Sequence, residues 1–224
     1  PGTAGRLWGG CLSRLPPFRA SRALPLLCSL FLMVTLTACT ASQPKNTENI
    51  CAIFNEKEDW YGDAADARDE WSSPIPVMMA IMHQESRFHA TARPPRKKVM
   101  GFIPWFRPSN AYGYSQALDS TWTEYERSAG RYGADRDEFS DAIDFIGWYN
   151  DKSHRRNGIA REDTYSLYLA YHEGHGGFSR GSYRSKKWLM DVARKVQRRA
   201  TTYQGQLQEC EEELKDTGWF SNWF

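Results

Sequence analysis

Apolar residues recur at steps of three and four along most of the chain after residue 48. This spacing places apolar side chains on one face of a helix, so it predicts helices rather than strands. Runs rich in proline, glycine or charge, such as SSPIP, RPPRKK, RRNG and GHGG, separate the periodic segments and predict the turns between them. The predicted helical segments span residues 48–71, 76–88, 119–133, 137–158, 164–174 and a last one from about 185. No run alternates strictly enough for more than one small β-hairpin, so we predict an all-α domain with a long C-terminal helix.

The last helical segment begins near Ser185 and carries a single apolar stripe. The stripe consists of Leu189, Val192, Val196, Ala200, Tyr203, Leu207, Cys210 and Leu214. Such a stripe is typical of a helix that packs on a core, and a coiled-coil partner is the alternative.

The N-terminus has the features of an export signal. Arg19 and Arg22 precede an apolar run, residues 23–36, which is too short to span a bilayer but has the length of a signal-peptide core. The run ends in LTAC, which resembles the lipobox where bacterial lipoproteins are cleaved and acylated on cysteine, here Cys39. A plain buried cysteine after a signal or anchor helix is the alternative. Thr40 stands where an aspartate commonly retains lipoproteins in the inner membrane, which favours the outer membrane.

These features divide the chain into four parts. We expect a signal peptide at 1–38, a lipid-anchored tether at 39–48, the folded domain at 49–215 and an aromatic tail at 216–224. Export leaves Cys51 and Cys210 in an oxidising compartment, near the two ends of the domain. A disulfide that fastens the terminal helices is predicted, with two free buried thiols as the alternative.

Composition narrows the range of ligands. The formal net charge of +2 over 224 residues is too close to zero to indicate nucleic acid binding. Aromatic residues make up 14% of the chain, which suits either a dense core or a groove that stacks on sugar rings.

Glu85 lies on an otherwise apolar helix face. Pro74 and Pro76 favour a helix start, after which Met78, Ile81, Met82, Glu85 and Phe88 share roughly one face. Burial and the negative end of the helix dipole both raise the pKa of a carboxyl group. The position therefore predicts an acid catalyst, although a solvated glutamate at a helix end is the simpler interpretation.

Two later segments carry further polar and aromatic side chains. AYGYSQALDSTW, residues 111–122, combines a turn at Gly113 with polar arms, and Asp119 or Ser120 can cap the next helix. LYLAYHEGHGGF, residues 167–178, is a tyrosine-rich helix that should end at its glycines.

Together these segments resemble the signature blocks of the soluble lytic transglycosylases, a family with a fold like that of goose-type lysozyme. Glu85-Ser86 corresponds to the first block, and the turn from Gly113 to Gln116 corresponds to the second, with its two middle residues changed. The sequence from Ala170 to Gly174 corresponds to the third, with His172 in place of asparagine. The resemblance spans about residues 72–180.

The resemblance implies a lysozyme-like fold and cleavage of peptidoglycan glycan strands between N-acetylmuramic acid and N-acetylglucosamine. Glu85 would be the single general acid and base, and the product would carry a 1,6-anhydro ring. It implies that Ser86, Gln116 and Tyr171 hold the sugar or orient Glu85. We also expect Tyr114 and Glu173 to contact the substrate, with a solvent-facing Glu173 as the alternative.

Two alternatives stay open. Glu173 or Asp119 as a second carboxylate would permit hydrolysis by a muramidase. A peptidoglycan-binding scaffold lipoprotein would use the same groove without catalysis.

Neither a cofactor nor a metal is expected, since the two histidines of HEGH are three residues apart rather than at the spacing of a zinc motif. We expect the protein to be lipid-anchored in the cell envelope and to face the periplasm. The basic and aromatic residues of 96–107 and the aromatic residues of 218–224 predict further contacts with a membrane or a protein partner.

Overall fold

The computed structural model describes residues 42–95, 98–99, 103–104 and 109–221, with side chains for 42–95 and 109–216. The predicted signal peptide, Cys39, and the side chains of 96–107 and 218–224 lie outside this part of the chain. The described residues form one compact unit. No helix within the described ranges is both long and apolar enough to cross a bilayer.

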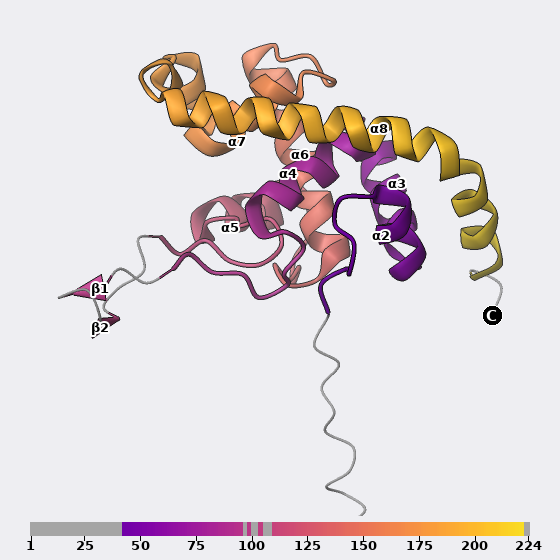
Figure 1. Cartoon of the computed structure of the whole chain (residues 1–224). Coiled ribbons are helices and arrows are strands. Elements are labelled where there is room, and N and C mark those ends of the chain that lie inside the picture. Colours follow the sequence, from indigo (N-terminus) through magenta and orange to yellow (C-terminus); the bar gives the residue numbers. More distant parts are fainter. Residues whose placement is uncertain (1–41, 96–97, 100–102, 105–108, 222–224) are drawn as a thin grey trace, which may run out of the picture. The chain divides into compact units, whose positions relative to one another are not determined.

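The all-α prediction is confirmed (Figure 1). The one hairpin of the described residues pairs β1 (Lys98–Val99) with β2 (Ile103–Pro104) in antiparallel register. The helices are α2 (Ile50–Glu56), α3 (Trp60–Trp71), α4 (Ile75–Ser86), α5 (Asp119–Ser128), α6 (Phe139–Asn157), α7 (Thr164–Ser179), the 3-10 helix η1 (Ser182–Ser185) and α8 (Lys187–Ser221).

Helix α4 is the central helix of the domain. Pro74 precedes it and Pro76 lies in its first turn, as predicted. Ten of its twelve residues are buried, so it is enclosed on all sides rather than on the single face that the sequence indicated. It packs against α6 and α8, which makes it a rigid support for any side chain at its C-terminal end.

Helix α8 runs across the domain and packs against α2, α4 and α7 (Figure 1). Most of the predicted stripe is buried, with Val192 and Cys210 partly buried and Ala193 as an additional core residue. The helix continues to Ser221, so the predicted boundary between domain and tail at residue 216 falls inside it.

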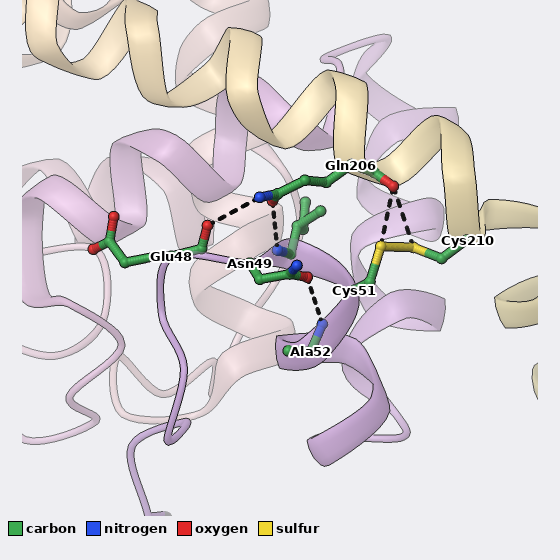
Figure 2. The surroundings of a disulfide bond; sticks show 7 residues. Glu48, Asn49, Cys51, Ala52, Gln206 and Cys210 are labelled. Atoms are coloured by element: carbon green, nitrogen blue, oxygen red, sulfur yellow. Dashed lines mark hydrogen bonds between the residues drawn. A yellow bond between two sulfur atoms is a disulfide. The ribbon is translucent and has the colours of Figure 1, made fainter.

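The predicted disulfide between Cys51 and Cys210 joins α2 to α8, with a Cα–Cα distance of 6.1 Å (Figure 2). Gln206 strengthens the same junction, because its Oε1 accepts from the backbone N–H of Ile50 at 3.0 Å. Asn49 caps α2 by accepting from the N–H of Ala52 at 2.9 Å. The two ends of the domain are therefore fastened both covalently and by hydrogen bonds.

Residues 42–48 do not form the free tether that the sequence predicts. The Gln43 amide donates to the backbone carbonyl of Arg87 at 2.8 Å, and the Lys57 ammonium donates to the Ser42 hydroxyl at 3.0 Å. Pro44 is buried. The polar composition of this segment predicts solvent exposure, but its polar groups bond to the domain instead.

Candidate active site

Glu85 occupies the last turn of α4, and the turn after it is tightly fixed. Arg87 and Phe88 both have positive φ angles, 53° and 63°, and the Arg87 N–H donates to the His83 carbonyl at 3.0 Å. Phe88 is fully buried and anchors the turn in the core. Glu85 is therefore positioned by a buried helix and a locked turn.

Ser86 serves this turn rather than a substrate. Its hydroxyl accepts from the N–H of Phe88 at 3.1 Å and donates to the Met82 carbonyl at 3.3 Å. Because the side chain is buried and both bonds are internal, the geometry favours the second of the two roles expected for Ser86, orienting Glu85, over a contact with sugar. Its contribution is to hold the end of the helix that carries Glu85.

The Glu85 carboxyl lies in an apolar and tyrosine-rich environment. Burial raises its pKa from 4.5 to about 7, although a hydrogen bond with Tyr168 acts in the opposite direction. Burial and the charge of Glu85 also raise the pKa values of Tyr168 and Tyr171, so both phenols stay protonated. No cation among the described residues forms an ion pair with Glu85. The direction that the sequence predicted for its pKa is confirmed.

Beside Tyr171 lies a tight turn that requires glycine. Gly113 has φ +78°, and a Cβ at this position would lie 1.9 Å from the backbone oxygen of Arg136. The Gln116 amide donates to the carbonyls of Ala92 and Gly113, both at 2.9 Å. The Tyr171 hydroxyl donates to the Ser115 carbonyl at 2.7 Å, which ties α7 to the turn.

A pocket of about 220 Å³ opens between this turn, α6 and α7. Gln116 and Tyr171 line it, as does Glu173, so the structure brings together three of the predicted substrate contacts. Its remaining lining residues are Ala117, Leu118, Thr121, Phe145, Tyr149, His172 and Gly174. Glu85 does not line this pocket; Tyr171 connects the two, since it lines the pocket and its pKa responds to the charge of Glu85.

Comparison with known families gives this arrangement a chemical context. Residues 27–210 match the family model described as a transglycosylase SLT domain. The chain belongs to this family. It is a peptidoglycan lytic transglycosylase, and its substrate is peptidoglycan. No curated protein and no solved structure matches the chain.

Tyr114 of the transglycosylase was expected to contact sugar, and this prediction is wrong. Its side chain is 1% exposed and meets the rings of Trp60 and Phe139 edge-on, at centroid distances of 5.7 and 6.0 Å. Ser115, the next residue, is buried as well. Tyr114 therefore packs in the core while Gln116 reaches the pocket.

Helix α7 does not end at its glycines. Gly174 breaks the helical geometry with φ 72° and ψ 156°, and the chain then resumes as a helix to Ser179. The kink lies in the wall of the pocket, next to His172 and Glu173. The glycines predicted the break correctly but not the second helical stretch, because a helix-breaking residue carries no information on whether the helix resumes after it.

Glu173 is held in a network of donors. Its side chain is 4% exposed, and the Lys186 ammonium donates to its two oxygens at 2.7 and 2.9 Å. Ser182 also donates to the carboxylate, and His172 Nδ1 lies 3.2 Å from it. Burial alone would raise the pKa of Glu173, but the bonds from Lys186, Ser182 and His172 lower it to about 2. Glu173 is therefore ionised at neutral pH.

Asp119 was expected to cap α5, but Leu118 occupies the N-cap position and makes no side-chain capping bond. Asp119 instead forms an ion pair with Arg136 at 2.7 Å and accepts from the Asn110 amide at 2.7 Å. It thereby closes the turn from Asn110 to Leu118.

Three residues near the site were not identified from the sequence. Tyr168 lies one helical turn before Tyr171, and this spacing could have placed both on the face toward Glu85. Lys186 and Trp188 lie just before and within the first turn of α8, where no sequence motif connects them to the site. Within the described ranges, no three His, Cys, Asp or Glu residues are grouped as metal ligands.

Proposed function

We propose that this transglycosylase cleaves the β-1,4 bond between N-acetylmuramic acid and N-acetylglucosamine, with Glu85 as its single general acid and base. The Glu85 carboxyl donates its proton to the glycosidic oxygen as the bond from C1 to that oxygen breaks. The Glu85 carboxylate then accepts the proton of the muramoyl 6-hydroxyl as that oxygen bonds to C1. The product is a 1,6-anhydro ring, no water is consumed, and Glu85 is again protonated.

The pKa of Glu85 carries this proposal. With a pKa of about 7, roughly half of the groups are protonated at neutral pH and half are available as base. At a pKa of 4.5, only about 0.3% of the groups would carry a proton at pH 7. The buried tyrosines around Glu85 supply the low polarity that makes one residue serve in both roles.

The environments of Glu173 and Asp119 argue against hydrolysis. A muramidase of the inverting type needs a second carboxylate that is free to activate water. The Glu173 oxygens are occupied by Lys186, Ser182 and His172, and Asp119 is paired with Arg136. Neither group is available as a base in this arrangement.

The test is mass spectrometry of purified murein after digestion. The protein is purified from cells that express the full chain, and the wild type is compared with Glu85→Gln. We expect anhydro-muropeptides from the wild type and none from the variant. Release of reducing ends would instead indicate a muramidase. Binding to murein without release by the wild type would favour the scaffold alternative.

We further propose that the protein is anchored through an acylated Cys39, faces the periplasm and is sorted to the outer membrane. The apolar run at 23–36, the LTAC sequence and Thr40 support this, and the family match includes Cys39. Labelling with a palmitate analogue, followed by membrane fractionation, tests it. Wild type should carry label in the outer-membrane fraction and Cys39→Ser should carry none; an unlabelled wild type would overturn the anchor.

A further inference from the structure

The pocket beside Glu85 is too small to hold a glycan strand. Its volume of about 220 Å³ lies below the range of about 300–1,000 Å³ that encloses typical small-molecule ligands. A polymer bound there must continue over the surface next to the pocket. The side chains at its edge therefore decide how the strand continues.

Large apolar side chains are exposed in and next to this pocket. Among the described residues, three such side chains are exposed: Leu118, Tyr132 and Trp188. Leu118 lines the pocket itself. Trp188, which is 56% exposed, lies against His172, another lining residue, with ring centroids 5.3 Å apart and ring planes at 79°. Exposed apolar side chains next to a pocket are typical of a binding surface.

We propose that Trp188 is a sugar-stacking subsite that holds the glycan strand where it leaves the pocket. This inference rests on the proposed function, since it takes the peptidoglycan glycan as the ligand. The indole offers a large, flat apolar face, which matches the C–H face of a β-linked pyranose. Its N–H remains a donor for the hydroxyl groups at the ring edge.

The position of Trp188 is fixed by a chain of contacts from α7 to α8. Lys186 lies just before α8 and binds both oxygens of Glu173 on α7. The neighbouring His172 meets Trp188 edge-on and lies 3.2 Å from Glu173. The start of α8, which carries the indole, is thus held beside the pocket wall before the ligand arrives, which reduces the entropy lost on binding.

The same contacts give Glu173 a structural role in positioning Trp188. Its carboxylate, ionised and almost fully buried, joins the helix that lines the pocket to the helix that carries the indole. Glu173 is a positioning residue in this assignment, and Trp188 is the residue that touches sugar.

The experiment measures binding of purified glycan strands, freed of their peptides, to the full chain carrying Glu85→Gln. Trp188→Ala should weaken binding about tenfold, whereas Trp188→Phe, which keeps a flat ring, should restore most of it. Tyr132→Ala is the matched control: Tyr132 is 77% exposed, lies between α5 and α6, and does not line the pocket. This control should bind as well as the parent.

A second measurement uses the wild-type background. Trp188→Ala should raise KM for glycan strands about tenfold and leave kcat nearly unchanged, because the indole acts on binding and not on proton transfer. Equal binding by Trp188→Ala and Tyr132→Ala, or no rescue by phenylalanine, would overturn the subsite. The subsite would also be overturned if Trp188→Ala bound glycan strands as well as the parent but bound vesicles of anionic lipid more weakly. That result would make Trp188 a membrane contact.

The failure of this inference can be distinguished from failure of the proposed function. Binding in the Glu85→Gln background does not depend on cleavage. If the wild type formed no anhydro product, the proposed reaction would be wrong, and the binding comparison would still decide the role of Trp188.

Discussion

Replacement of Glu85 by glutamine is expected to stabilise the protein at alkaline pH. Burial raises the pKa of the Glu85 carboxyl from 4.5 to about 7, so the folded state holds this proton more tightly than the unfolded state. Stability from this group is then fully present below about pH 4.5 and is lost as pH rises through about 7. The difference of about 2.5 pKa units corresponds to roughly 3 kcal/mol, which the glutamine variant does not lose.

Two buried histidines change the pH dependence of stability in the opposite direction, so their contribution must be separated from that of Glu85. Burial, with nearby positive charge, lowers the pKa values of His83 and His175 to about 4. Between about pH 4 and 6.5 the unfolded state binds these protons more readily, so the histidines make stability rise with pH. The wild-type curve therefore combines opposing slopes. The difference between wild type and Glu85→Gln isolates the glutamate, because both proteins contain the same histidines.

The assay is urea unfolding at pH 4 and pH 8, with the disulfide intact and salt constant. The two proteins should have nearly equal free energies of unfolding at pH 4, and the variant should be more stable by about 3 kcal/mol at pH 8. Glu58→Gln, at an exposed position between α2 and α3, is the control and should show no such divergence. A constant difference between wild type and Glu85→Gln across this pH range would refute the reasoning.

Other changes test the supports of the site. Gly113→Ala should lower the free energy of unfolding by at least about 2 kcal/mol in urea titration, because the new Cβ would lie 1.9 Å from the Arg136 carbonyl oxygen. Replacing Cys51 and Cys210 together by serine should cost about 3–5 kcal/mol, since the bond joins residues 159 positions apart, and a reducing agent should then have no further effect. Glu173→Gln should be less stable than wild type at pH 7. The free energies of unfolding of the two proteins should converge as pH falls from 4.5 to about 2, because the stability that comes from the lowered pKa is full above about pH 4.5 and is lost as pH falls through about 2.

The sequence predicted the fold correctly where burial decides which positions are apolar. The stripe on α8, the proline-marked start of α4 and the pairing of Cys51 with Cys210 were all predicted from spacing and compartment, and the structure contains each of them. Boundaries were less predictable. The polar composition of residues 42–48 predicts a tether, yet Gln43 bonds to the end of α4. The composition of a segment indicates how well water solvates it. Whether a polar segment packs on the domain depends on hydrogen-bond partners that are distant in sequence.

The sequence predicted only those residues of the candidate site that lie within the three short motifs. Glu85, Gln116 and Tyr171 follow from short motifs, but the motif at Gly113 could not separate Gln116, which lines the pocket, from Tyr114, which is buried. The contribution of α8 was not predictable, because Trp188 reaches the pocket edge through helix packing and not through sequence proximity.

The contrast between Glu85 and Glu173 supports a reaction without water. The Glu173 side chain is almost fully buried and Glu85 is partly buried, and burial alone would raise the pKa of each. Glu85 bonds to the phenol of Tyr168 and its pKa rises to about 7, whereas Lys186 and its neighbours hold the pKa of Glu173 at about 2. A group that is ionised at neutral pH and paired can neither give a proton to a leaving oxygen nor readily take one from water. The mechanism that we propose therefore gives both proton transfers to one carboxyl group, and its nucleophile, the muramoyl 6-hydroxyl of the substrate itself, requires no second base.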